Sequence, residues 1–201
     1  MSDRSEAVTQ TKGERRRQQI VDAAKDLLIK SGPNLLVLRD LAEQLGITHG
    51  NLQYYFPTKN DLLVAIFDQE LAKYTDSVKN SAAAASTQKG RLTAILDAGL
   101  AELRSPDTAL WRMLMSMADH SPEMAAILKQ ENERYQGVVA RELKNVAPGM
   151  SAQRRRHVAK IIHAMLDGLG IQRIHEDPDG PELRALVSEI KAAIFAIVEA
   201  G

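Results

Sequence analysis

The side chains best suited to specific recognition gather in the segment "GITHGNLQYYFPTK", residues 46–59. Four of them carry hydrogen-bonding tips within one short stretch: His49, Asn51, Gln53 and Tyr54. Asn and Gln amides can pair bidentately with adenine, and a His ring can donate to a guanine acceptor. Thr48, directly before them, can bond a phosphate. The segment therefore has the chemistry needed to read the base edges of a duplex.

Residue types that support catalysis form no comparable constellation. The chain has no cysteine, which excludes disulfides, thiolate nucleophiles and Cys-bound metals. His163 and Asp167 have i, i+4 spacing, but such a pair on a helix is more often a surface hydrogen bond than a metal site. Nucleophile motifs, phosphate-binding glycine loops and paired-carboxylate signatures are missing. We therefore expect no enzyme activity, catalytic residue, metal or cofactor.

The periodicity of the apolar residues predicts an all-α fold of nine helices, since almost no segment alternates as a strand would. The first of these helices follows a polar tail, residues 1–11, that we expect to be disordered. Start and stop signals place the helices at residues 12–31, 38–45, 49–56, 59–83, 91–104, 105–120, 121–146, 151–175 and 181–199. Thr11 and Glu14 have the spacing of a capping box at the start of the first.

Two short helices joined by a turn at Gly46 are typical of a helix-turn-helix. Leu52, Tyr55 and Phe56 have i, i+3, i+4 spacing and would anchor the second of these helices, which leaves the polar tips on other faces. Gly50 costs a helix about 1 kcal/mol relative to Ala. A close approach to DNA explains that glycine better than a merely solvated face does.

Charge gives weaker information. Lys plus Arg equals Asp plus Glu at 26 each, so the net charge gives no long-range attraction to a polyanion. Residues 12–60 nevertheless hold eight basic and five acidic side chains, a local charge of +3. The run "RRR" at residues 15–17, ending in Arg17, could reach a phosphate or the minor groove. An ordinary solvated helix face remains an equal alternative for this run.

Residues 14–67 resemble the DNA-binding domain of the TetR/AcrR family of bacterial transcriptional regulators. The resemblance lies in two segments, "RRQQIVDAAKDLLIKSG" and "LRDLAEQLGITHGNLQYYFPTKNDLL". The family signature G-(I/V)-(S/T)-x-G-x-(L/I)-x-x-(Y/H)-F-x-(S/T)-K is matched from Gly46 to Lys59. The resemblance implies DNA contacts from Thr48, His49, Gly50, Asn51, Gln53, Tyr54, Tyr55 and Lys59. Val37 stands where the family usually has a capping Ser or Thr that touches phosphate. A contact there would come from a backbone N–H or from Arg39.

The rest of the chain carries no motif of similar strength. Its most unusual stretch is "LWRMLMSMADHSPEMAAIL", in which Trp111, Met115 and Ala118 share a helix face. Such walls suit an apolar or cationic ligand, although ordinary core packing is the simpler interpretation of each residue. The family resemblance implies an effector between these helices. Further candidate contacts are Tyr135, His163 and Met165.

The last two predicted helices hold small residues among larger apolar ones, a pattern that allows close helix packing. "DGLGIQ" resembles the "DGL" element of family members with a BetI-like C-terminal domain, whose last two helices build a four-helix homodimer interface. Apolar patterning alone cannot separate an interface from a core. The resemblance implies a dimer through Ala164, Gly168, Ile171, Ala193, Ile194 and Ile197.

Together these features predict a helix-turn-helix domain at residues 12–60 and an effector-binding and dimerisation domain at 61–201. The expected function is a cytoplasmic transcriptional regulator, a repressor, that binds a palindromic DNA operator as a homodimer and is released by a small-molecule effector. No apolar run is long enough to cross a membrane. Two alternatives remain: a regulator of the same fold without an effector, or an all-α adaptor or enzyme whose helix-turn-helix is vestigial.

Overall fold

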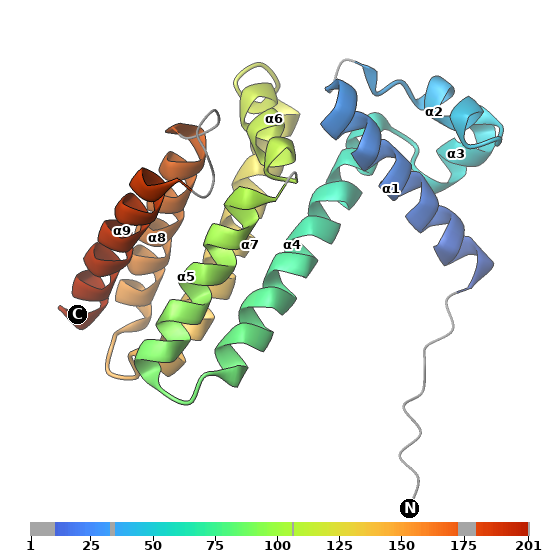
Figure 1. The fold of residues 1–201 in the computed structure, drawn as a ribbon. Helices are drawn as coiled ribbons and strands as arrows, with labels where there is room; N and C mark the ends of the chain where they lie inside the picture. Colours follow the sequence, from blue (N-terminus) through green and yellow to red (C-terminus); the bar gives the residue numbers. More distant parts are fainter. Residues whose placement is uncertain (1–10, 33–34, 106, 173–179, 201) are drawn as a thin grey trace, which may run out of the picture. The chain divides into compact units, whose positions relative to one another are not determined.

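The computed structural model describes residues 11–32, 35–105, 107–172 and 180–200, and throughout these ranges the regular structure is helical (Figure 1). The described residues up to Ile66 form one compact unit, and those from Phe67 onward form a second. The helices are α1 Lys12–Ser31, α2 Leu38–Gln44, α3 His49–Tyr55, α4 Lys59–Ala84, α5 Gln88–Arg104, α6 Thr108–Ala118, α7 Pro122–Val146, α8 Ala152–Gln172 and α9 Pro181–Glu199. The predicted all-α class is confirmed.

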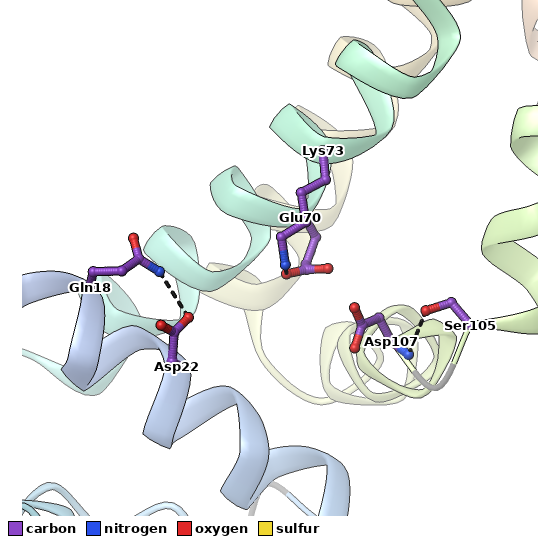
Figure 2. Close-up of polar contacts among 6 residues, drawn as sticks. All are labelled: Gln18, Asp22, Glu70, Lys73, Ser105 and Asp107. Carbon is purple, nitrogen blue, oxygen red and sulfur yellow. Dashed lines mark hydrogen bonds and ion pairs between the residues drawn. The ribbon is translucent and has the colours of Figure 1, made fainter. Parts of the chain in front are cut away.

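The first unit begins with a strongly specified helix. The Thr11 hydroxyl accepts from the Glu14 backbone N–H at 3.2 Å, and the Glu14 carboxylate accepts from the Thr11 N–H at 2.7 Å. This capping box satisfies two N–H groups that a helix start leaves without partners. Farther along α1, the Gln18 amide donates to Asp22 at 2.8 Å (Figure 2). The buried side of α1 consists of Ile20, Val21, Ala24 and Leu28.

The turn between α2 and α3 depends on Gly46, whose φ of 63° lies in the left-handed region. This geometry lets the Gly46 N–H donate to the Glu43 carbonyl and the Ile47 N–H donate to the Ala42 carbonyl, both at 3.0 Å. The start of α2 is weaker, because Val37 occupies the N-cap and offers no side-chain hydrogen bond. The expected missing hydroxyl cap is therefore confirmed.

The second unit is built around α7, which packs against α5, α6 and α8, while α9 packs against α5 and α8 (Figure 1). Its core joins apolar residues of α4, α5, α7, α8 and α9, among them Val78, Ile95, Val139, Ile162 and Ile194, each at most 1% exposed. α4 takes part in both units, because its first turns bury Leu62 and Leu63 in the first and its later turns bury Leu71 and Val78 in the second.

Two helix starts differ from the sequence prediction. α5 begins at Gln88, three residues before the predicted 91, because the Thr87 hydroxyl accepts from the Gly90 N–H at 3.0 Å and caps it. α6 begins at Thr108, although Ser105 still contributes: its hydroxyl accepts from the Asp107 N–H at 3.1 Å (Figure 2). Three parts of the predicted helices and tail lie outside the described residues: the tail up to residue 10, the predicted helix residue Pro106, and the end of the predicted 151–175 helix.

None of the helices in the described part of the chain combines the length and the apolar character that crossing a lipid bilayer requires.

Replacing Gly46 by Ala should lower the free energy of unfolding by about 1 kcal/mol, because a Cβ in the left-handed region is strained. Apart from its two chain neighbours, no described residue has an atom within 4 Å of that Cβ position, so the effect isolates the backbone conformation. Gly149→Ala is the matched control, since its Cβ position is equally open and its φ is not left-handed. Denaturant titrations of both variants measure the difference, and equal stabilities would contradict the role given to Gly46.

Candidate functional site

The polar face of α3 is directed to solvent. His49, Asn51 and Gln53 are exposed, and Tyr54 retains 80% of its surface. The opposite side of the same helix ends in Leu52 and Phe56, which are at most 1% exposed. Burying these two apolar side chains fixes the rotation of α3, so the hydrogen-bonding tips point away from the unit's core.

The start of α3 is fixed as firmly as its rotation. The Thr48 hydroxyl accepts from the Asn51 backbone N–H at 3.1 Å, which defines the first turn of the helix. Thr48 can still donate its hydroxyl proton to an external acceptor. At Gly50, no atom of the described residues outside the local helix backbone lies within 4 Å of the place where a Cβ would stand. The structure of the free chain therefore gives no packing reason for a glycine at this position.

A groove runs beside this face, between the N-terminal part of α1 and the length of α3. Three cationic side chains of α1 line it, Lys12, Arg15 and Arg16, together with Asn51 and Tyr55 of α3. Basic side chains placed along a recognition helix are suited to hold the phosphates that flank the bases being read. The neutral total charge gives no sign of this local arrangement.

Among the arginines at 15–17, the structure separates two roles. Arg15 and Arg16 line the groove, whereas the Arg17 guanidinium lies 4.8 Å from the centre of the Phe56 ring. This cation–π contact ties α1 to the end of α3 within the unit. Arg17 remains exposed, so its contact with DNA stays a prediction. Arg15 and Arg16 become further candidates because they line the groove.

The remaining candidates of the first unit lie on α2 and α4. Arg39 is exposed on α2, while Leu35 and Val37 just before that helix expose 59% and 45% of their surfaces. Lys59 is partly buried at the start of α4, and this burial lowers the pKa of its ammonium group. Of these residues, Arg39 is the more freely presented cation.

The second unit contains a cavity of about 80 Å³ that brings together several predicted ligand contacts. Trp111 and Met115 of α6, Tyr135 of α7 and His163 of α8 all line it. The other two candidates lie elsewhere. Ala118 borders a separate polar groove with α7, and Met165 packs against the hydrophobic core.

The cavity wall also includes helices in which the sequence shows no ligand site. α4 contributes Glu70, Leu71 and Tyr74, and α5 contributes Glu102 and Leu103. Glu70 is only 6% exposed and accepts from the Lys73 ammonium at 2.9 Å (Figure 2). A buried carboxylate at the middle of α4 is a signal of function, but only tertiary structure shows that it is buried.

Three rings stack along one side of the cavity. Tyr135 lies between Tyr74 and His163, with ring centres 4.4 Å apart on each side. The Tyr74 hydroxyl oxygen is buried and has no hydrogen bond of acceptable geometry within the described residues. Burial raises the pKa of both tyrosines, and the negative charge of Glu102 raises it further. The hydroxyl groups therefore remain protonated, and the carboxylates of Glu102 and Asp167 lie on the same cavity wall.

His163 is held by two polar partners. Its Nε2 lies 3.1 Å from the Asp167 carboxylate and its Nδ1 lies 3.0 Å from the Gln136 amide nitrogen. Because the carboxylate can only accept, Nε2 carries the proton and Nδ1 accepts from Gln136. Burial lowers the pKa of His163, against the opposing effect of Asp167. The i, i+4 pair of the sequence is thus a hydrogen bond at the cavity wall.

The predicted dimer residues separate into two groups. Ala164, Ala193 and Ile171 are exposed, the last at 48%, and Gly168 is half-buried beside them on α8. Leu186 of α9 adds an apolar side chain that is 37% exposed. These residues leave an apolar surface on α8 and α9.

Two of the predicted interface residues are directed inward. Ile194 is 0% exposed in the core of its own chain, and Ile197 packs against that core. The assignment of Ile194 to an interface is therefore corrected, since its side chain already fills an internal position. Ile194 directly follows Ala193 in the sequence, but successive residues lie about one hundred degrees apart around a helix.

Comparisons with known proteins agree with this geometry. Residues 20–66 match the profile described as "Bacterial regulatory proteins, tetR family", and residues 88–196 match "BetI-type transcriptional repressor, C-terminal". The HTH-type transcriptional regulator BetI of Rhizobium meliloti (strain 1021) is 28% identical over 160 residues, covering 79% of this chain and 77% of the relative. BetI of Yersinia pestis (strain Pestoides F) is 26% identical over 161 residues, covering 78% and 80%.

A solved structure of a transcriptional regulator from Saccharomonospora viridis, in complex with choline, shares the fold with a TM-score of 0.67. It is 17% identical, and the alignment covers 92% of this chain and 96% of that one. The second of the two matching profiles spans more than half of the 201 residues. The chain therefore belongs to the TetR family of bacterial transcriptional regulators, with a C-terminal part of the BetI repressor type.

Proposed function

We propose that this regulator binds a palindromic operator as a homodimer, acts as a repressor in the bacterial cytoplasm, and leaves the DNA when a small effector occupies the cavity. The observation that carries the DNA-binding part is the exposed polar face of α3, set on a buried Leu52 and Phe56. In helix-turn-helix proteins this part of the second helix enters the major groove.

Distinct roles follow for the residues of the first unit. Asn51 and Gln53 would read base edges, with His49 and Tyr54 beside them. Thr48, Arg15, Arg16 and Arg39 would bond phosphates and fix the register. Gly50 would allow the backbone of α3 to approach the groove, because a side chain there would project toward the duplex.

A dimer is the natural reader of a palindrome, since two recognition helices must enter successive major grooves about 34–36 Å apart. The apolar surface left on α8 and α9 by Ala164, Ile171 and Leu186 supports a partner subunit there. Its small residues would let two copies of α8 approach closely. The family assignment supports the same arrangement.

The effector part of the proposal rests on α4. This helix lines the cavity with Glu70, Leu71 and Tyr74 and buries Leu62 and Leu63 in the core of the DNA-binding unit. A ligand that prefers a shifted position of α4 would change the placement of the recognition helices. The aromatic wall supports an apolar or cationic effector, and the choline complex of the S. viridis regulator is consistent with such a ligand.

The most informative experiment is the selection of bound fragments from genomic DNA with the full chain. Enrichment of a common palindrome near a promoter is the expected result. Failure to enrich any sequence at low salt would contradict sequence-specific DNA binding and would favour an adaptor or another role for this fold. The enriched sequence then supplies the specific duplex on which variants of the recognition helix are measured.

Replacing Asn51 by Ala should weaken binding to the selected operator by roughly 1–3 kcal/mol while affecting random DNA much less. Arg39→Ala should weaken both duplexes similarly and reduce the dependence on salt by about one phosphate contact. Titrations at several salt concentrations distinguish the two patterns. If both variants lose specific and random binding in the same proportion, Asn51 does not read a base.

Gly50→Ala should raise the free energy of unfolding by up to about 1 kcal/mol, because the new Cβ would clash with none of the described residues and alanine favours the helix. The same variant should bind the operator about tenfold more weakly. Gly137→Ala on α7 is the control, with a similar gain in stability and unchanged DNA affinity. Operator affinity equal to wild type in Gly50→Ala would exclude the close approach.

Ala164→Arg should convert the dimer to monomers, since a long cation would enter the apolar surface of α8. Ala126→Arg places the same change on an exposed position of α7 and should leave the dimer intact. Sedimentation velocity measures both. An intact Ala164→Arg dimer would show that the interface lies elsewhere on the chain.

A further inference from the structure

Some polar side chains of the cavity wall have hydrogen-bond or ion-pair partners within the chain, and others have none among the described residues. Glu70 accepts from Lys73, and Asp167 accepts from the His163 ring. Glu102 also interacts within the chain. The acidic side chains of the wall therefore already have partners, although their charges remain inside a partly buried space.

Arg112 is different. It is the only arginine or lysine on the described wall of the cavity, and it is half-buried. Among the residues that the structure describes, it makes no hydrogen bond or ion pair. Asn132, which faces the same cavity from α7, is also without such a partner in the described part of the chain. A planar guanidinium with unused N–H groups is the side chain best shaped to hold a carboxylate.

The opposite chemistry surrounds the tyrosines. Three carboxylates belong to the cavity wall, those of Glu70, Glu102 and Asp167. Burial raises the pKa of the Tyr135 hydroxyl, and the charges of Asp167 and Glu102 raise it further. The Tyr74 oxygen beside it is buried and unsatisfied within the described residues. With Trp111 and Met115 in the wall, this region suits an onium group that carries apolar substituents.

The size of the cavity limits what fits. A volume of about 80 Å³ holds roughly five to eight water molecules, so a ligand of on the order of ten heavy atoms can fill it. A compound of that size can present one positive and one negative group, separated by a few methylene units. Leu71, Leu103 and Leu166 provide apolar contacts for such a spacer.

From this arrangement we infer that Arg112 is an anion-binding residue and that the effector is a small zwitterion, with an onium group near Tyr74 and a carboxylate held by Arg112. The inference rests on the proposed effector response. The aromatic wall alone would predict a simple cation as the ligand, and Arg112 adds a carboxylate to that prediction. Arg112 thereby becomes the residue that distinguishes the zwitterion from a cation of the same shape.

Three probes of nearly equal shape test the charges separately. 4-(Trimethylammonio)butanoate is the zwitterion, 4-(trimethylammonio)butanamide has only the positive charge, and 5,5-dimethylhexanoate has only the negative charge. Calorimetric titration of the full chain should show the zwitterion binding at least about tenfold more tightly than either of the others. Equal or tighter binding of the amide, or no binding of any of the three, would overturn the inference.

Variants at Arg112 identify the group responsible. Arg112→Gln should bring the zwitterion and the amide to within about twofold of each other, because both would then meet a neutral side chain. Arg112→Lys should retain part of the preference for the zwitterion over the amide. Lysine keeps the positive charge but lacks the planar guanidinium that can bind a carboxylate through two N–H groups. Arg141→Gln, at an exposed position of α7 away from the cavity, should behave as wild type. An undiminished preference in a folded Arg112→Gln variant would remove Arg112 from the site.

DNA affinity measured with and without the zwitterion separates this inference from the proposed function. Binding of the zwitterion without any change in operator affinity would leave the ligand assignment intact and exclude effector control by this class of compound. Normal operator binding with no response to any probe, in calorimetry or in DNA affinity, would reject the zwitterion and leave the DNA-binding regulator in place.

Discussion

The burial of one side of a seven-residue helix is the constraint on which the DNA-binding unit depends. α3 is too short to be stable by itself, since isolated helices of this length are marginal in water. Leu52 and Phe56 supply the tertiary contacts that hold it, and the same contacts determine which side chains remain outside. The face that stabilises α3 is therefore opposite the face that we propose to read DNA. A change that loosened the apolar side would alter the orientation of every polar tip at once.

The second unit reverses this arrangement, because its polar groups converge on an internal space. A Tyr–Tyr–His stack and several carboxylates lie among leucines, where each unsatisfied polar group is costly. Proteins rarely keep such groups inside without a partner for them. The buried Tyr74 oxygen and Arg112, which makes no hydrogen bond or ion pair among the described residues, are thus more informative than the apolar walls, which any helical bundle would provide.

The parts of the molecule that are predictable from the sequence are those encoded locally. The capping box at Thr11, the left-handed turn at Gly46 and the spacing of Leu52 and Phe56 each act within a few residues, so the order of the amino acids is enough to recognise the helix-turn-helix. The cavity is only partly predictable. Trp111 stands out by its type, but Glu70 and Tyr74 lie dozens of residues earlier and join it only through packing.

Tertiary contacts also decide what the sequence leaves open. Ile194 and Ala193 are adjacent in the sequence and similar in character, yet one fills the core and the other is exposed, because helix rotation is decided by tertiary contacts. Arg17 belongs to a run of three arginines that the sequence cannot rank. Its position over Phe56 follows from the angle between α1 and α3, which no local pattern specifies.

Trp111 is the only tryptophan of the chain, and it lines the cavity with its ring centre 5.5 Å from that of Phe67. The protein thus contains a single indole fluorophore at the very place where a ligand would sit, and none in the DNA-binding unit. Its emission reports the polarity of the cavity alone, without a dye and without interference from the duplex. Occupancy of the cavity by a ligand can therefore be followed through the intrinsic fluorescence of the protein.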